Sequence, residues 1–278
     1  MKVLILGATG LLGKALVRQW TGDEVLPMGS RDVDIRDSAK VREIIVKARP
    51  DWIVLAAAYT DVDGCESHRE LAFSVNRDGA VNVAQAAREA DAKVIFLSSD
   101  YVFDGKKSSP YEVNDPRNPQ SVYGHTKAEA EVKLLSVFPH CCIARASWVF
   151  GVGGRCFPDT ILRLGASRSA LDVVNDQRGC PTYTVDMAQA IIQLCRKNVS
   201  GIVHVTNWGD CTWFEFAKEI FKQAGMGTEV KPVSSQQMAR PAPRPAYSVL
   251  SATSLRRVGI EMPSWQDALC RYLEERKN

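Results

Sequence analysis

Three side chains in the middle of the chain have the types and spacing for carbonyl chemistry: Ser99, Tyr123 and Lys127. Ser99 follows a short apolar run over residues 94–97, which predicts a buried strand. Tyr123 and Lys127 are four residues apart in a stretch with helical spacing, so they lie one turn apart on one helix face. A strand-end hydroxyl, a phenol and an ammonium can then converge on one substrate oxygen.

The chemistry of these groups explains why the set is useful. A phenol has a pKa of about 10 and is a poor acid–base catalyst at neutral pH. A nearby ammonium favours the phenolate, so we expect Lys127 to lower the pKa of Tyr123. Ser99 could donate a hydrogen bond to the carbonyl oxygen as negative charge develops there. A Tyr-x-x-x-Lys pair also arises by chance, so it needs support from the rest of the chain.

The start of the chain supplies that support. An apolar strand over residues 2–7 runs into Gly7-x-x-Gly10-x-x-Gly13 and then a helix, which is the context of a dinucleotide-binding motif. Gly7 permits the tight turn, Gly10 lets a pyrophosphate approach the helix N-terminus, and Gly13 lets the helix pack closely on the strand. We predict cofactor contacts along this turn, at Gly7, Thr9, Gly10, Leu11, Leu12 and Gly13.

The second predicted strand, residues 24–29, indicates which dinucleotide is used. An acidic residue at its end would hydrogen-bond the ribose of NAD, whereas Arg accommodates the extra phosphate of NADP. Ser30 and Arg31 follow the strand, so the sequence favours NADPH, with NADH possible. The alternative for Arg31 is an ordinary exposed loop arginine. Asp34 and Ile35, which precede the next helix, are also predicted cofactor contacts.

Strands and helices alternate through the first half of the chain, which predicts an α/β fold with a doubly wound parallel sheet, Rossmann-like in type. Further strands are expected over residues 52–58, 94–97, 142–150 and 201–206, and one long helix over residues 66–90. Ligands of such sheets bind at the carboxyl ends of the strands. Small residues there let a flat cofactor lie against the sheet, so the end of the third strand is predicted to contact it, at Ala56, Ala57, Ala58 and Tyr59.

Length and composition limit the kinds of protein that this chain can be. The chain has 278 residues, 45% of them hydrophobic and 24% charged, which fits one large or two coupled domains. We expect a dinucleotide-binding domain over residues 1–150, to which residues 182–207 return. A smaller α/β substrate lobe is expected over residues 151–181 and 208–278. The net charge of +3 is scattered and no apolar run approaches a membrane span, so neither nucleic acid nor a membrane is indicated as a partner.

The cysteines indicate the compartment. The eight Cys include no C-x-x-C pair, and the four His do not combine with them into a set of zinc ligands. We therefore expect free thiols in a reducing cytoplasm and no metal site.

Taken together, the motifs resemble the extended short-chain dehydrogenase/reductase superfamily, and within it the dTDP-4-dehydrorhamnose reductase family. The resemblance covers nearly the whole chain. The matching residues are Gly7-x-x-Gly10-x-x-Gly13, Ala57-Ala58-Tyr59-Thr60-x-Val62-Asp63-x-x-Glu66, Asn76, Ser98-Ser99-Asp100-Tyr101-Val102-Phe103-x-Gly105, Tyr123-Gly124-x-Thr126-Lys127, Arg145-x-Ser147-Trp148-Val149-Phe150-Gly151, Asp176-Gln177-x-Gly179-x-Pro181-Thr182, Trp213 and Arg244-Pro245-x-x-Ser248.

The resemblance implies NAD(P)H-dependent reduction of the C4 keto group of dTDP-4-dehydro-L-rhamnose to dTDP-L-rhamnose. Tyr123 would protonate O4, and Lys127 would hold the nicotinamide ribose and tune Tyr123, so both would also contact the cofactor. Ser99 would take the place usually held by Thr. The nucleotide sugar would be the partner, and the implied substrate contacts are Val62, Ser99, Asp100, Tyr101, Trp148 and Arg244.

Several alternatives stay open. Cys156 and Asp159 depart from the family pattern in the expected substrate lobe, which puts the identity of the sugar in doubt. Some members dimerise through Mg²⁺ held by a Glu where this chain has Ala15, so we expect a monomer or homodimer without that metal. Core packing of Trp148 and a solvated loop position for Arg244 are the alternatives to their substrate roles.

Two other functional classes also fit the sequence. One is a non-catalytic regulatory protein on the same fold, since the regulatory β subunit of methionine adenosyltransferase is similar to these reductases. The other is a reductase or epimerase that acts on another nucleotide-linked sugar.

Overall fold

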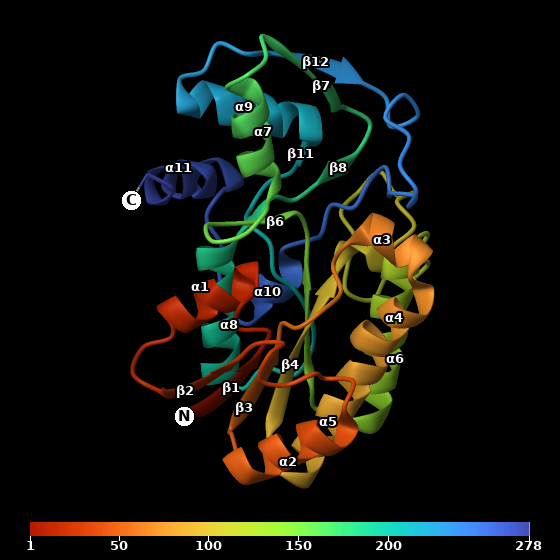
Figure 1. Cartoon of the computed structure of the whole chain (residues 1–278), viewed down its shortest axis with the longest axis vertical. Helices are drawn as coiled ribbons and strands as arrows, with labels where there is room; N and C mark the ends of the chain where they lie inside the picture. Colours follow the sequence, from red (N-terminus) through yellow and green to blue (C-terminus); the bar gives the residue numbers. More distant parts are fainter. Residues whose placement is uncertain (278) are drawn as a thin grey trace.

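The computed structural model describes residues 1–277, and a six-stranded sheet lies at its centre (Figure 1). Its order is β10-β5-β4-β3-β1-β2, and every neighbouring pair is parallel. The predicted doubly wound α/β class is therefore confirmed. The strands are β1 (Lys2–Leu6), β2 (Glu24–Met28), β3 (Trp52–Leu55), β4 (Lys93–Ser99), β5 (Cys142–Ala146) and β10 (Gly201–His204).

Helices cover both faces of this sheet, which is why its inner strands are continuous apolar runs. Alternate residues of β1 enter different cores: Val3 and Ile5 pack on one face, and Leu4 and Leu6 on the other. The first face is covered by α1 (Leu11–Gln19) and α8 (Thr184–Arg196). The second face is covered by α2 (Ser38–Ala48), α5 (Gly79–Glu89) and α6 (Val122–Val137).

The helix expected over residues 66–90 is divided into several pieces, so that prediction was wrong in its continuity. The pieces are α3 (Val62–Ser67), α4 (Arg69–Phe73), the π-helical turn η1 (Ser74–Asp78) and α5. His68 leaves the helical region, with φ −122° and ψ 52°, and separates α3 from α4. The π-turn carries the buried Asn76, and such turns often occur at functional sites.

The strand expected over residues 142–150 is also divided. It forms β5 and the short β6 (Val149–Phe150), and Ser147 and Trp148 lie between them. Trp148 has a φ of +45°, a left-handed conformation that interrupts extended backbone.

A smaller group of elements lies beyond the carboxyl ends of the strands, at the top of Figure 1. Three two-stranded pairs belong to it: β6 with β9 (Thr182–Tyr183), β7 (Ala170–Val174) with β12 (Glu229–Val233), and β8 (Arg178–Gly179) with β11 (Cys211–Thr212). Its helices are α7 (Phe157–Gly165), α9 (Trp213–Ala224) and α11 (Trp265–Glu275). Aromatic residues fill its core, including Phe150, Phe216 and Tyr272. The short α10 (Thr253–Arg257) packs beside β10.

Three further observations concern the described part of the chain. No helix within residues 1–277 is long and apolar enough to cross a membrane. All eight cysteines lie in this range as free thiols, and only Cys270 of them is exposed. No three His, Cys, Asp or Glu side chains in the range are grouped so that they could hold a metal ion.

Candidate active site

The turn between β1 and α1 is built for close backbone approach. Gly7 has a φ of +92°, and a Cβ on it would lie 2.5 Å from the Ala57 nitrogen. A Cβ on Gly13 would lie 2.1 Å from the Gly7 carbonyl oxygen. No side chain caps the N-terminus of α1 at Gly10, as expected where a phosphate meets the first N–H groups of a helix. The cradle therefore fits a dinucleotide pyrophosphate.

A hollow of about 470 Å³ opens beside this turn, at the carboxyl ends of β1, β2 and β3. Many of the predicted cofactor residues line it: Gly7, Thr9, Gly10, Ser30, Asp34, Ile35, Ala56, Ala57 and Ala58. The other predicted contacts lie outside its wall, namely Leu11, Leu12, Gly13, Arg31, Tyr59, Tyr123 and Lys127. The individual cofactor contacts stay predictions.

Arg36 is a basic residue in this hollow that sequence reasoning missed. Its guanidinium pairs with the Asp34 carboxylate, with 2.5 Å between Nη2 and Oδ2. The pair lowers the pKa of Asp34 and raises that of Arg36. The Asp-x-Arg spacing after the second strand was visible in the sequence. Arg31, by contrast, is exposed and does not line the hollow.

The structure brings Ser99, Tyr123 and Lys127 together. Ser99 is the last residue of β4, and the other two lie in the first turns of α6. The Ser99 hydroxyl lies close enough to the Tyr123 phenol to lower its pKa by donating toward the phenol oxygen. Lys127 Nζ lies 6.0 Å from the centroid of the Tyr123 ring and donates to the Leu97 carbonyl oxygen at 2.9 Å.

The pKa of Tyr123 is shifted in the direction opposite to the one expected from its Lys neighbour. Desolvation raises the pKa, and the hydrogen bond from Ser99 opposes this rise. A raised pKa keeps the phenol protonated at neutral pH, which suits a group that donates a proton. Desolvation also lowers the pKa of the buried Lys127 ammonium to about 8.

Buried polar groups hold the two elements that carry this trio. Asn76 accepts from the Tyr59 N–H at 2.7 Å and donates to the Thr126 hydroxyl at 3.0 Å, so η1 fixes both the segment that follows β3 and helix α6. Glu131, one turn beyond Lys127, pairs with the fully buried Arg145 of β5 at 2.7 Å. These contacts join α6 to its neighbours beneath the site.

Trp148 is held by packing on both sides. Its ring stacks on Trp213 with 3.4 Å between centroids and 8° between planes. A Cβ on Gly179 would lie 2.5 Å from the Trp148 ring, so only glycine leaves room there. The ring is half-buried, so its predicted contact with the substrate stays a prediction.

Arg244 is neither free nor solvated. It makes two hydrogen bonds to the Asp63 carboxylate of α3, both 3.0 Å long, and another to Tyr101. It also lines a hollow of about 570 Å³ together with Gln177 and Trp213. The predicted substrate residue Val62 begins α3 beside this ion pair.

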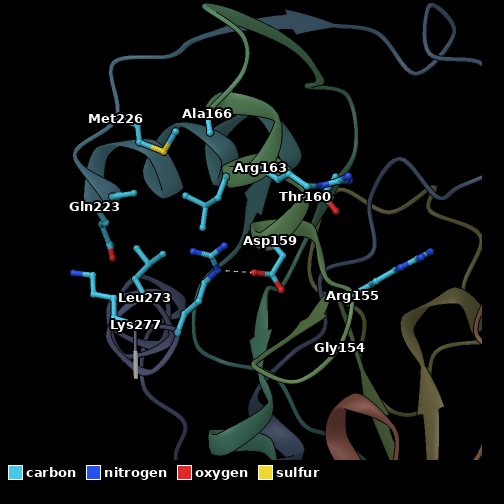
Figure 2. A pocket seen from close by; sticks show the side chains of 13 residues that line it. Gly154, Arg155, Asp159, Thr160, Arg163, Ala166, Gln223, Met226, Leu273 and Lys277 are labelled. Carbon is cyan, nitrogen blue, oxygen red and sulfur yellow. Dashed lines mark hydrogen bonds and ion pairs between the residues drawn. The ribbon is translucent and has the colours of Figure 1, made fainter.

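Another hollow, of about 1,020 Å³, lies between α7, α9 and α11 and contains none of the predicted site residues (Figure 2). Its basic side chains do not converge. Arg276 pairs with Asp159 at 2.7 Å, and Arg155 and Arg163 extend to the side opposite Gln223. The predicted site therefore does not coincide with this hollow.

The fold and the site together define a class. A Rossmann-type parallel sheet with Ser, Tyr and Lys gathered beside a dinucleotide cradle is that of an extended short-chain dehydrogenase/reductase, which is an oxidoreductase. The whole chain, residues 1–278, matches the family model described as the RmlD substrate binding domain. The protein belongs to this family, which is that of the dTDP-4-dehydrorhamnose reductases, as its motifs predicted.

Full-length relatives agree with this assignment. The spore coat polysaccharide biosynthesis protein SpsK of Bacillus subtilis is 39% identical, over 100% of this chain and 98% of the relative. The structure of a dTDP-4-dehydrorhamnose reductase from Clostridium acetobutylicum has a TM-score of 0.98 and 37% identity, covering 100% of both chains. A dTDP-4-dehydrorhamnose reductase from Bacillus anthracis, solved in complex with NADP, has a TM-score of 0.96 and 38% identity, covering 99% of this chain and 100% of that one.

Proposed function

We propose that this protein uses NADPH to reduce the C4 keto group of dTDP-4-dehydro-L-rhamnose, which gives dTDP-L-rhamnose. The observation that carries the proposal is the convergence of Ser99, Tyr123 and Lys127 beside the cradle at Gly7. The NADP complex of the Bacillus anthracis reductase supports the cofactor.

The residues of this chain have distinct roles in the proposed reaction. The nicotinamide cofactor, when bound, supplies the hydride. Tyr123 gives its phenolic proton to the carbonyl oxygen that becomes the C4 hydroxyl. Lys127 holds a positive charge beside the phenol, which stabilises the phenolate left after that transfer. Desolvation around Tyr123 keeps its proton in place until the substrate oxygen gains negative charge.

We further propose that two parts of the chain bind different ligands. The cofactor is bound by residues 1–150 with 182–207, and the nucleotide sugar by residues 151–181 with 208–278. The hollow lined by Gln177, Trp213 and Arg244 supports the second part, because it offers an aromatic ring, an amide and a cation to one ligand. We propose a cytoplasmic location, which the free thiols support, and a monomer or homodimer.

A second candidate function is the reduction of another nucleotide-linked keto sugar. One observation favours keeping it: the full-length relative SpsK is named for spore coat polysaccharide synthesis. The non-catalytic alternative is less favoured, because the catalytic trio is intact and assembled.

One assay separates these functions. NADPH oxidation is followed with a panel of 4-keto nucleotide sugars, and each product is identified by NMR. The proposal predicts the highest kcat/KM for dTDP-4-dehydro-L-rhamnose. A faster reaction with another sugar would leave the reductase but replace its substrate, and tight NADPH binding without turnover of any sugar would indicate the regulatory function.

A further inference from the structure

The short helix α3 is held firmly at its N-terminal end. The Asp61 carboxylate caps it by accepting from the Gly64 N–H at 3.0 Å. Asp63, in its first turn, accepts two hydrogen bonds of 3.0 Å from Arg244 and one of 3.1 Å from the Ala242 N–H. Arg244 and Ala242 both line the hollow of about 570 Å³. The position of α3 is therefore fixed relative to that hollow.

Glu66, near the other end of α3, contacts the helix that carries the proposed proton donor. Its Oε1 accepts from the Val122 N–H at 2.8 Å, although the two residues are 56 positions apart in the sequence. Val122 is the first residue of α6, and Tyr123 is the second. Glu66 belongs to one of the family motifs, but the proposed reaction gives it no role. Its contact joins α3 to the turn of α6 that carries Tyr123.

The N-terminus of α6 also has an ordinary local cap. The first N–H groups of a helix lack partners within it, and the residue just before the helix commonly supplies one. Ser121 does so here, because its hydroxyl oxygen accepts from the Gly124 N–H at 3.1 Å. Tyr123 thus lies between two residues whose N–H groups are held, and only one of the two acceptors is local. The distant acceptor, Glu66, restricts where the first turn of α6 can lie.

The packing of Tyr123 shows that its position depends on this turn. Its side chain packs against the cluster formed by Cys65, Ala72 and Val122. Its ring meets that of Tyr101 edge to face, with 5.6 Å between the centroids. Rates are sensitive to such placement, since a reacting group misplaced by about 1 Å can cost about 100-fold. A contact that fixes the first turn of α6 can therefore affect the proton transfer without touching the reacting atoms.

We propose that Glu66 is a positioning residue for the reduction: it holds the first turn of α6 at Val122 and so keeps the Tyr123 phenol in place. The inference rests on the proposed function and adds a residue to it. Two carboxylates of α3 then have complementary roles. Asp63 holds the segment at Arg244 that lines the hollow, and Glu66 holds the helix of the proton donor. The short helix thereby fixes the donor relative to that segment.

A pair of substitutions at Glu66 tests this proposal. Glu66→Gln keeps a side-chain oxygen that accepts from the Val122 N–H, whereas Glu66→Ala removes the acceptor. We expect kcat to fall about 10- to 100-fold in Glu66→Ala and to stay within about threefold in Glu66→Gln. The KM for the sugar and the Kd for NADPH should stay within about threefold in both, since no ligand contact is removed. An equal loss of kcat in the two variants, or none in Glu66→Ala, would overturn the proposal.

Two further variants separate positioning from general stability. Ser264→Ala removes the N-cap of α11, which carries none of the predicted site residues, so it should lower Tm but leave kcat within about threefold. In a Tyr123→Phe background, Glu66→Ala should cost less than about threefold more in kcat, because the donor that Glu66 positions is gone. If Glu66→Ala does not fold, Glu66→Asp, whose side chain is one methylene shorter, takes its place in the same cycle.

Crystal structures of the wild type, Glu66→Ala and Glu66→Gln give a readout that does not depend on turnover. The first turn of α6 and the Tyr123 ring should move only in Glu66→Ala. An unmoved ring in that variant, or the same loss of kcat with and without the Tyr123 hydroxyl, would contradict a positioning role. Absence of turnover by the wild-type protein would instead refute the proposed function, while the structures still decide the role of Glu66.

Discussion

At the scale of single residues, Lys127 is a member of the catalytic trio whose charge changes within the pH range of an enzyme assay. Its pKa is lowered to about 8 by burial, so the ammonium is present below that pH and is lost above it. We expect kcat/KM to fall as the pH rises through about 8, because the neutral amine no longer stabilises the phenolate. A pH profile measured with NADPH and sugar tests this, and a flat profile to pH values near 10 would exclude Lys127 from the titration.

Tyr123 has the most direct residue-scale prediction. Tyr123→Phe removes the proton donor but keeps the ring, so kcat should fall by about 10²–10⁴-fold while the Kd for NADPH changes little. Tyr111→Phe is a matched control, because it removes a phenol of another buried tyrosine, which donates to Asp104. Near-normal kcat in Tyr123→Phe would remove this residue from the mechanism.

The preference for NADPH is also decided by single side chains. Arg31 was predicted to bind the extra phosphate, and Arg36 lines the hollow. We expect kcat/KM to favour NADPH by about tenfold, the value of one charge-assisted contact. Measurement with both cofactors, in the wild type, Arg31→Ala and Arg36→Ala, shows which arginine carries the preference. A preference that survives both substitutions would contradict this origin.

At the scale of elements, the turn from β1 to α1 gives a sharp test. Gly7→Ala places a Cβ 2.5 Å from the Ala57 nitrogen at a φ of +92°. We expect loss of NADPH binding and a stability loss of more than about 1 kcal/mol. Gly22 is the matched control, since its φ is +80° and nothing lies within 4 Å of its Cβ position. Calorimetric binding and thermal unfolding compare the two, and equal NADPH affinity in both variants would mean that the cradle is not the cofactor site.

Some of these helices, strands and turns could be predicted from the sequence, and others could not. The strands of the sheet and the cradle followed from apolar runs and glycine spacing, which are local signals. The π-turn at Asn76 did not, because such turns are rare and short and have no residue pattern of their own. The left-handed Trp148 did not either, since a non-glycine residue gives no sign of a positive φ.

The sequence predicted which residues form the site, but it did not predict the contacts among them. Ser99, Tyr123 and Lys127 were found because two of them share a helix face and the third ends a strand. The pairing of Arg244 with Asp63 joins residues 181 positions apart, and that of Ser147 with Asp100 joins residues 47 apart. The spacing of apolar residues along the chain gives only local information, so it cannot predict pairs so far apart in the sequence. The direction of the Tyr123 pKa shift was predicted wrongly for a related reason. The rise comes from desolvation, which depends on residues that pack around Tyr123 only in the folded chain.

At the scale of the whole molecule, the cofactor sheet and the elements beyond its strand ends must act on one substrate. The Asp63–Arg244 pair connects α3 with the segment before Ser248, so the two parts are joined beside the hollow lined by Gln177, Trp213 and Arg244. In the proposed function, binding energy from the nucleotide positions the keto carbon for the hydride step. We expect a 4-keto sugar without its dTDP group to lose kcat/KM by about 10³-fold or more, measured as NADPH oxidation. Equal rates for the free and nucleotide-linked sugars would contradict this coupling.

The central claim is hydride transfer to C4 of dTDP-4-dehydro-L-rhamnose with Tyr123 as the proton donor. It is tested by incubating the protein with this sugar and NADPH that carries deuterium in both hydrogen positions at C4 of the nicotinamide, and by locating the label in the product by NMR. We predict dTDP-L-rhamnose with one deuterium at C4, formed by the wild type and scarcely by Tyr123→Phe. An unlabelled product, a label at another carbon, or no product from a folded protein that binds NADPH would contradict the account.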